Sequence, residues 1–186
     1  MNFVKFNHMK IFLTGKPGVG KTTMVKKFVK TFKDKTIGFW TEEVRDKTTH
    51  QRISFKIVDT FGNESVFASK NFNSNYIVGS YKVDLYKFES IALKVIYESL
   101  NKPHKIIVID EIGKMELFSK NFVDLVLRIV FDEKLNFLAT LPIRDVHPVV
   151  KKIREMKNIK IFEVTFENKN YILEDIIKLF ENTCQF

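Results

Sequence analysis

The apolar residues of this chain follow two patterns that alternate along the sequence. Short runs that are apolar almost throughout are typical of strands buried on both faces of a sheet. Longer stretches with apolar residues three and four positions apart predict helices with one buried face. The predicted strands are 10–14, 39–45, 53–60, 65–69, 105–110, 136–140 and 159–164, and the predicted helices are 21–32, 88–100, 119–131, 147–156 and 171–180.

Strands that alternate with helices of this length predict an α/β fold, in which a mostly parallel sheet carries helices on both faces. The chain has 186 residues, which suits one domain, and it contains no repeat, low-complexity tract or flexible linker. We therefore expect a single domain over residues 1–186. Residues 1–8 form a candidate N-terminal extension, because Met9 stands directly before the first predicted strand.

The composition adds an expectation about the environment of the protein. There is one cysteine, Cys184, so no intrachain disulfide can form, which fits a reducing compartment. No apolar run approaches the roughly 18 residues needed to span a bilayer, and the first ten residues do not resemble a signal peptide. We expect a cytoplasmic protein without a membrane partner, and we expect it to be a monomer.

The first predicted strand leads into the sequence GKPGVGKT, residues 15–22, which is a phosphate-binding loop. Successive backbone N–H groups and the start of a helix form an anion site, and glycine allows the backbone to approach the phosphates closely. Lys21 is expected to bridge the β- and γ-phosphates and act in catalysis, while the Thr22 hydroxyl binds Mg²⁺. The predicted nucleotide-binding residues of this segment are Gly15, Lys16, Pro17, Gly18, Val19, Gly20, Lys21, Thr22 and Thr23.

The second chemical feature is an acidic pair, Asp110 and Glu111, at the end of the apolar strand 105–110. Ligands of open α/β sheets bind at the carboxyl ends of the strands. Asp110 is therefore predicted to complete the Mg²⁺ site with Thr22, and Glu111 to orient or deprotonate the attacking water. The alternative is that Asp110 is a loop or cap residue and Glu111 a solvated neighbour.

Two further residues are weaker candidates. Thr140 ends a predicted strand, where a polar residue often senses the γ-phosphate in P-loop enzymes with such an acidic pair. Arg45 also ends a strand, and it could neutralise charge on the transferring phosphoryl group within the same chain. Thr140 is equally compatible with an ordinary strand-end threonine, and Arg45 with an exposed strand-end arginine. Lys114 and Arg144 compete with Arg45 for the same role on less support.

The net charge of +9 raises the question of nucleic-acid binding. The excess is mostly lysine scattered along the chain, whereas specific phosphate and base recognition favours arginine, of which there are only five. A solvated, lysine-rich surface is therefore the simpler interpretation, and a nucleic-acid-stimulated ATPase stays open as an alternative.

The motifs of this chain can be compared with those of two other classes of P-loop protein, the switch GTPases and the small-molecule kinases. Residues 110–113 match the Asp-x-x-Gly pattern of switch GTPases, but guanine selection needs Asn-Lys-x-Asp, and the best candidate, residues 168–171, ends in tyrosine. Small-molecule kinases usually carry an arginine-bearing lid that excludes water. Between residues 112 and 135 the only arginine is Arg128, inside a predicted helix. Hydrolysis is thus favoured, with a P-loop nucleotide or polynucleotide kinase as the alternative.

Several stretches of the chain resemble the THEP-type nucleoside-triphosphatases, also called cancer-related nucleoside-triphosphatases. These stretches are residues 12–23 (FLTGKPGVGKTT), 38–45 (GFWTEEVR), 78–85 (VGSYKVDL) and 107–119 (IVIDEIGKMELFS), together with Thr140 and Pro142. They cover nearly the whole predicted domain. The pattern of the family after Pro142 is variable, so Arg144 carries over only weakly.

The resemblance implies a RecA-like P-loop NTPase fold and Mg²⁺-dependent hydrolysis of ATP, GTP, CTP and UTP to diphosphate and phosphate. Such broad use of bases agrees with the lack of a base-reading motif in the sequence. The resemblance also implies that a second segment binds the nucleotide, namely Ile106, Ile107, Val108, Ile109, Asp110, Glu111, Ile112 and Gly113.

Overall fold

The computed structural model of the protein describes residues 8–183. Cys184 and most of the candidate N-terminal extension lie outside the described residues. The strands are β1 (Lys10–Thr14), β2 (Thr36–Arg45), β3 (Arg52–Asp59), β4 (Glu64–Ser69), β5 (Ile77–Val78), β6 (Tyr81–Val83), β7 (Ile106–Asp110), β8 (Asn136–Thr140) and β9 (Lys160–Glu163). The α-helices are α1 (Lys21–Thr31), α2 (Leu85–Leu100), α3 (Lys120–Phe131), α4 (Pro148–Arg154) and α5 (Lys169–Thr183), and the 3₁₀ turns are η1 (Lys33–Lys35) and η2 (Glu116–Phe118).

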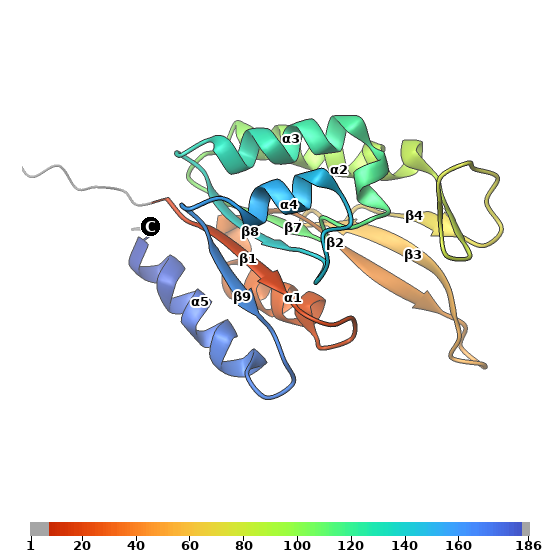
Figure 1. Ribbon diagram of the computed structural model, residues 1–186, viewed down its shortest axis with the longest axis horizontal. Coiled ribbons are helices and arrows are strands. Elements are labelled where there is room, and N and C mark those ends of the chain that lie inside the picture. Colours follow the sequence, from red (N-terminus) through yellow and green to blue (C-terminus); the bar gives the residue numbers. More distant parts are fainter. Residues whose placement is uncertain (1–7, 184–186) are drawn as a thin grey trace, which may run out of the picture.

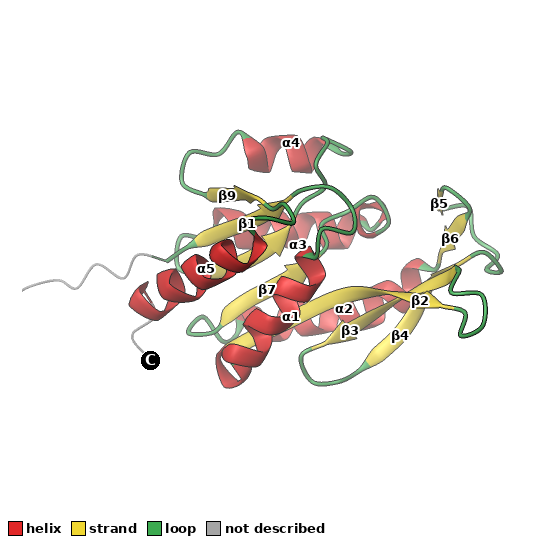
Figure 2. Cartoon of the chain, turned by 90° about the horizontal axis from the view of Figure 1, so that it is seen from below, coloured by secondary structure: helices red, strands yellow, loops and turns green. Residues whose placement is uncertain are grey.

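All nine strands of the described residues form one sheet, in the order β5-β6-β4-β3-β2-β7-β8-β1-β9. The half made of β2, β7, β8, β1 and β9 is parallel, and β8 lies between β1 and β7. Helices α2, α3 and α4 cover one face of this half, while α1 and α5 cover the other (Figure 1, Figure 2). The predicted α/β class and the two-sided covering of the sheet are confirmed.

The other half of the sheet is an antiparallel extension built on the long strand β2. Strands β3 and β4 follow it as successive antiparallel neighbours, and the short pair β6 and β5 completes the edge. The sequence pattern predicts β3 and β4 but not β5 and β6. These two strands contain two and three residues, which is too short for a periodic pattern to develop.

Two element starts differ from the predictions for identifiable reasons. Helix α2 begins at Leu85, one turn before the predicted residue 88, because the Asp84 side chain accepts a hydrogen bond from the backbone N–H of Lys87 (3.1 Å) and caps the helix. Strand β2 begins at Thr36 instead of residue 39, since β7 pairs with it from Thr36 onward. The predicted cap of α3 is confirmed: the Ser119 hydroxyl accepts from the N–H of Phe122 (3.1 Å).

The sheet separates two apolar layers that hold the helices in place. Beneath α2 and α3 the fully buried ring of Phe88 contacts Phe39 and Phe122, with ring centroids 5.9 and 5.3 Å apart. On the opposite face Phe28 of α1 meets Phe180 of α5 at 5.2 Å. Burial of such rings stabilises the fold by roughly 1.5–3 kcal/mol per side chain, with a further contribution from edge-to-face contacts.

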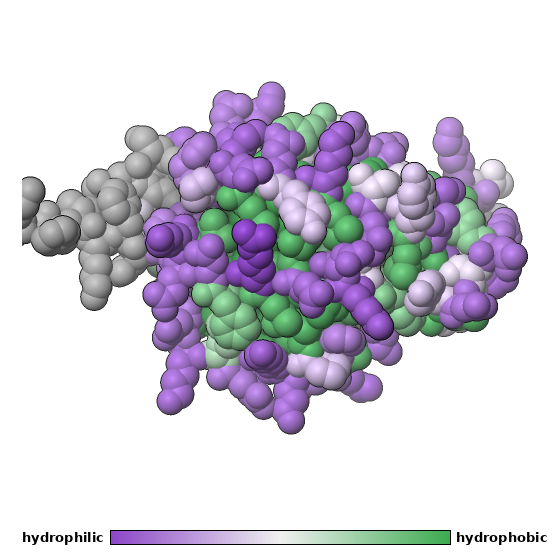
Figure 3. Space-filling view, turned by 90° about the horizontal axis from the view of Figure 1, so that it is seen from above, coloured by the Kyte–Doolittle hydropathy of each residue, from purple (hydrophilic) through white to green (hydrophobic). Residues whose placement is uncertain are grey.

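Hydrophilic side chains spread over the face seen in Figure 3 and surround several apolar areas, instead of collecting in one patch. In the part of the chain that the structure describes, no helix combines the length and the apolar character needed to cross a bilayer.

Gly38 lets the paired strands β2 and β7 approach each other closely. It has a φ of +153°, and a Cβ atom built there would lie 1.8 Å from the carbonyl oxygen of Val108. No side chain fits at that distance, so any larger residue must push apart two central parallel strands.

We expect Gly38→Ala to lower the free energy of unfolding by more than about 3 kcal/mol, because it overpacks the centre of the sheet. Urea unfolding of both proteins measures this loss. The control is Gly62→Ala, where φ is +89° but no atom lies within 4 Å of the added Cβ. That variant carries backbone strain alone, roughly 1–2 kcal/mol. Equal losses in the two variants would contradict the steric explanation.

Candidate functional site

Three neighbouring parallel strands end at one edge of the sheet, and each end carries a residue marked by the sequence. Strand β1 leads into the phosphate loop, residues 15–22, β7 ends at Asp110, and β8 ends at Thr140. Because β8 pairs in parallel with both β1 and β7, it brings the loop and the acidic pair to either side of Thr140. This edge is where ligands of open α/β sheets bind.

The phosphate loop borders a cavity of about 480 Å³, here named the phosphate cavity. Its wall is formed by the loop and the first turn of α1, by parts of β2 and β3, and by Glu111. The predicted residues Lys21, Thr22, Arg45 and Glu111 therefore meet at one cavity. Its volume lies in the range of small-molecule sites.

Three glycines give the phosphate loop its path. Gly15, Gly18 and Gly20 have φ values of +144°, +81° and +106°, which disfavour residues with a side chain. At Gly15 a Cβ atom would also lie 2.4 Å from the carbonyl oxygen of Val164, since the end of β9 passes directly beside it. Val19 is buried and anchors the loop in the core, whereas Lys16 is exposed.

The start of α1 is open to an anion. No side chain caps the helix, and its first turn contains no acidic residue. The first N–H groups of a helix have no partners within the helix, so they are available to phosphate oxygens. The Lys21 ammonium group lies over the loop, donating to the carbonyl oxygens of Gly15 (3.0 Å) and Lys16 (3.3 Å).

Asp110 is a buried carboxylate with one oxygen in use. Asp110 is 1% exposed, and its Oδ1 accepts a hydrogen bond from the Thr140 hydroxyl at 2.5 Å. Oδ2 is buried without a hydrogen-bond partner. Burial raises the pKa of Asp110, while the hydroxyls of Thr140 and Thr22 and the charge of Lys21 act in the opposite direction. An unpaired buried oxygen is costly, and a cation beside it would offset that cost.

These residues fit Mg²⁺ bound together with a triphosphate. Mg²⁺ prefers oxygen ligands and is usually held by one or two protein groups plus substrate phosphates. Asp110 Oδ2 and the Thr22 hydroxyl supply such oxygens. Among residues 8–183 no cluster of three or more His, Cys, Asp or Glu side chains could hold a metal alone, so an ion here would depend on oxygens from the nucleotide and from water.

Glu111 lies between the acidic end of β7 and the phosphate cavity. Burial raises its pKa, the negative charge of Asp110 raises it further, and the charge of Lys21 lowers it. The next residue, Ile112, donates its N–H to the carbonyl oxygen of Thr140 (3.0 Å), which holds the main chain after the acidic pair against β8. A carboxylate with a raised pKa is a better proton acceptor, as a general base requires.

A third acid, Glu116, belongs to this site although the sequence reasoning missed it. It is 5% exposed, and its Oε2 and the Oε1 of Glu111 both lie close over Gly113, 2.9 and 3.1 Å from the position of a Cβ atom there. Burial, and next the charge of Glu111, raise the pKa of Glu116 to about 8. The sequence feature that could have identified Glu116 is an acid set among apolar residues soon after the acidic pair. Glutamate is rarely buried without a partner, so an acid in such a run is a candidate site residue.

The cationic candidates differ in how they are held. Arg45 borders the phosphate cavity, but it pairs with Glu43 and donates to the carbonyl oxygen of His50 (3.0 Å). Arg52, which was not predicted, also borders this cavity and pairs with Glu43 at 2.7 Å. Arg144 lies exposed in the loop after β8 and does not border the phosphate cavity.

The second predicted binding segment divides into two parts. Residues 106–109 are fully buried in β7, between β2 and β8, so their side chains belong to the core. They contribute to the site by fixing where Asp110 lies. Gly113 does border a cavity, next to Glu111.

The chain is similar to known proteins over almost its full length. A family model described as NTPase matches residues 10–177. The nucleoside-triphosphatase THEP1 of Aquifex aeolicus is 52% identical over 177 residues, which cover 93% of this chain and 99% of that protein. The human cancer-related nucleoside-triphosphatase is 38% identical over 180 residues, which cover 90% of this chain and 94% of that protein.

Solved structures show the same similarity in three dimensions. The crystal structure of THEP1 from Aquifex aeolicus aligns with a TM-score of 0.88 and 49% identity, covering 93% of this chain and 99% of that one. The solution structure of a human cancer-related nucleoside triphosphatase gives a TM-score of 0.78 and 37% identity, covering 94% and 98%.

The raised pKa of Glu116 predicts a pH dependence of stability. Between its ordinary value of 4.5 and about 8, the folded chain keeps a proton on Glu116 that the unfolded chain has lost, so the free energy of unfolding falls as pH rises. This loss is at most about 1.4 kcal/mol per pH unit. Glu116→Gln removes this proton and its contribution to the pH dependence. Urea unfolding at pH 5, 6, 7 and 8 should show the variant gaining stability relative to wild type with pH.

The control for this experiment is Glu174→Gln on the exposed face of α5, which should follow the wild type at every pH. Parallel pH curves for wild type and Glu116→Gln would contradict the buried proton.

Proposed function

The chain belongs to the nucleoside-triphosphatase family and is a hydrolase of nucleoside triphosphates, and we propose that it works with Mg²⁺ and with little selection among bases. The family resemblance and the P-loop NTPase fold are thereby confirmed. The observation that carries the Mg²⁺ site is the unpaired Oδ2 of Asp110. This oxygen is buried at the end of β7, next to Glu111 and on the same edge of the sheet as the phosphate loop.

Binding of the triphosphate rests on the phosphate loop. The N–H groups at the start of α1 bind phosphate oxygens, and Lys21 exchanges its backbone carbonyl partners for the β- and γ-phosphates. Thr22 and Asp110 would hold Mg²⁺, whose charge neutralises part of the triphosphate. Thr140 keeps Asp110 in place through its hydrogen bond (2.5 Å).

Glu111 is the proposed general base. It accepts a proton from a water molecule while the water oxygen attacks the γ-phosphorus, and the bond from that phosphorus to the β–γ bridging oxygen breaks. The products are the nucleoside diphosphate and inorganic phosphate. Arg45, at the rim of the phosphate cavity, is proposed to offset the negative charge that spreads over the phosphoryl oxygens.

Broad use of ATP, GTP, CTP and UTP is supported by the state of residues 168–171, the segment that comes nearest to a guanine-reading motif. Within it, the Asn168 side chain accepts from the N–H of Thr165 (2.8 Å) and donates to the carbonyl oxygen of Glu163 (2.9 Å). Its amide therefore stabilises the turn between β9 and α5.

Phosphate release measured over the four nucleoside triphosphates tests the proposal. We expect hydrolysis of all four at rates within about tenfold of one another, and loss of activity when EDTA removes the metal. Glu111→Gln should lower kcat by about 10²–10⁴ while nucleotide binding persists, because only the proton acceptor is lost. Lys21→Ala should weaken nucleotide binding itself.

Glu174→Gln serves as the matched carboxylate control and should retain wild-type rates, since this side chain is exposed on α5. Wild-type turnover by Glu111→Gln would show that Glu111 is not the base. Full nucleotide affinity in Lys21→Ala would refute the assignment of the phosphate loop.

Arg45→Ala tests, by the same phosphate-release assay, whether Arg45 offsets charge on the phosphoryl oxygens. If Arg45 stabilises charge in the transition state, its removal should lower kcat by about tenfold or more with little change in KM. Arg128→Ala, an exposed arginine on α3, is the control and should behave as wild type. A rise in KM with kcat unchanged would instead show that Arg45 contributes only uniform binding, and would contradict its role in the transition state.

A further inference from the structure

A second cavity meets the phosphate cavity at Glu111. It has a volume of about 550 Å³ and is here named the side cleft. The turn between β5 and β6 forms one wall, the segment from Gly113 to Glu116 forms the floor, and the loop after β8 forms the other wall with Pro142 and Val146. Glu111 and Pro17 border both cavities, so the side cleft opens onto the place proposed for the γ-phosphate.

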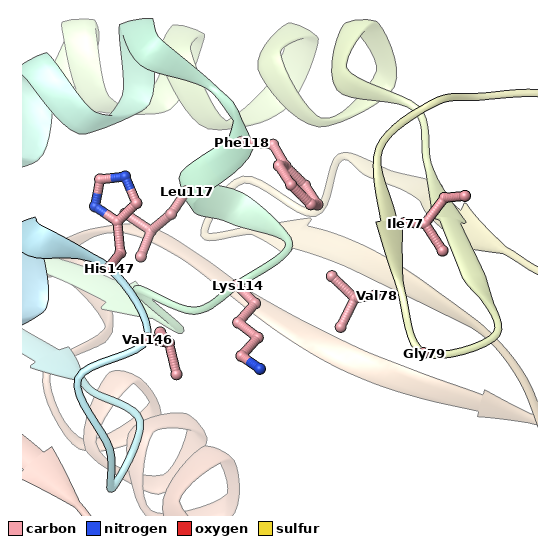
Figure 4. A pocket seen from close by; sticks show the side chains of 8 residues that line it. All are labelled: Ile77, Val78, Gly79, Lys114, Leu117, Phe118, Val146 and His147. Carbon is pink, nitrogen blue, oxygen red and sulfur yellow. The ribbon is translucent and has the colours of Figure 1, made fainter.

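The side cleft continues away from Glu111 into a hollow of about 280 Å³ (Figure 4). The two share Val78, Gly79, Lys114 and Val146. A water molecule takes up about 30 Å³ of liquid, and sites for small organic ligands measure about 300–1,000 Å³. The side cleft is therefore large enough for a small organic ligand next to Glu111.

The side cleft combines apolar walls with one unpaired cation. Figure 4 shows Lys114 projecting from the segment before η2 into the space between Val146 and Val78. Among the described residues, Lys114 has no hydrogen-bond or ion-pair partner. The other cation of this cleft, Arg52, is already paired with Glu43 and bonded to the Tyr81 hydroxyl (3.2 Å). Lys114 is therefore the group available to an anionic ligand.

These features describe a ligand with three parts. A hydroxyl group would reach Glu111, a phosphate would pair with Lys114, and a planar or apolar body would lie between the valine walls. Glu111 and Lys114 both border this cleft, so a hydroxyl and a phosphate carried by one small molecule would reach both side chains. A nucleoside 3′-monophosphate with a free 5′-hydroxyl has this chemistry, either as a free nucleotide or as the 5′-hydroxyl end of an oligonucleotide.

We propose that the side cleft binds a hydroxyl-bearing monophosphate of nucleotide size as a phosphoryl acceptor, so that the enzyme also transfers the γ-phosphoryl group. This inference rests on the roles proposed above for the phosphate loop and Glu111. The acceptor oxygen forms the new bond to the γ-phosphorus, and the bond to the β–γ bridging oxygen breaks. The diphosphate leaves with that electron pair, and Glu111 takes the hydroxyl proton.

The test uses the whole chain with ATP labelled on the γ-phosphate and Mg²⁺. Label is followed into inorganic phosphate and into three acceptors: adenosine, adenosine 3′-monophosphate, and a short oligonucleotide with a 5′-hydroxyl. We expect the 3′-monophosphate to be labelled at least about tenfold faster than adenosine, because only it can pair with Lys114. Comparison with the oligonucleotide separates a free nucleotide from a nucleic-acid end.

Two sets of variants connect the transfer to the side cleft. Lys114→Ala should abolish the preference for the phosphate-bearing acceptor, and Lys114→Arg should keep it. Val146 borders the side cleft and not the phosphate cavity, so Val146→Phe should lower transfer about tenfold or more while phosphate release in the absence of acceptor stays within about twofold. Urea unfolding confirms that each variant is folded.

The outcomes separate the two proposals. Phosphate release without labelling of any acceptor would overturn the acceptor site and leave the triphosphatase function standing. Equal labelling of adenosine and its 3′-monophosphate would overturn the role of Lys114 and with it the proposed ligand class. Absence of both products would overturn the proposed function together with this inference.

Discussion

The buried carboxylate of Asp110 is the interaction on which the site depends. It lies at the end of a strand that is buried on both faces, one of its oxygens is held by Thr140, and the other has no hydrogen-bond partner. A charge in such surroundings is tolerated only with a compensating partner. Lys21 supplies part of this compensation from the phosphate loop, and a metal ion bound with the triphosphate would supply the rest. In the proposed reaction, binding of the triphosphate with its metal would therefore also relieve a buried charge.

The strand order makes this arrangement possible. Because β8 separates β1 from β7, Thr140 stands between the phosphate loop and the acidic pair and can hold Asp110 from the side. The same negative charge influences its neighbours. Burial and the charge of Asp110 raise the pKa of Glu111, and burial and the charge of Glu111 raise the pKa of Glu116 to about 8. Close packing of three acids thus favours a neutral Glu116 and a Glu111 that accepts protons readily.

The antiparallel extension gives the site its outer wall. Strands β2 and β3 carry Arg45 and Arg52 to the phosphate cavity, and the small β5–β6 pair faces the loop after β8 across the side cleft. Glu43 pairs with both arginines and so limits their freedom. Lys114, in contrast, extends into the side cleft without a partner. In the proposed function the parallel half would therefore hold the triphosphate, and the antiparallel extension would define what else can reach it.

The sequence by itself determined the phosphate loop, the acidic pair, the α/β class and most elements, because glycine spacing and apolar periodicity are local signals. It also showed that Asp110 ends a buried strand. Tertiary structure alone decided the burial of Glu116, the pairing of Arg45 with Glu43, and the existence of β5, β6 and the side cleft. These features arise from contacts between residues distant in the chain, and local patterns do not encode which charges meet or what space remains between elements. The motifs identify the groups proposed to bind a triphosphate, while the packing around Asp110 sets the pKa values of the acids there and their neighbours.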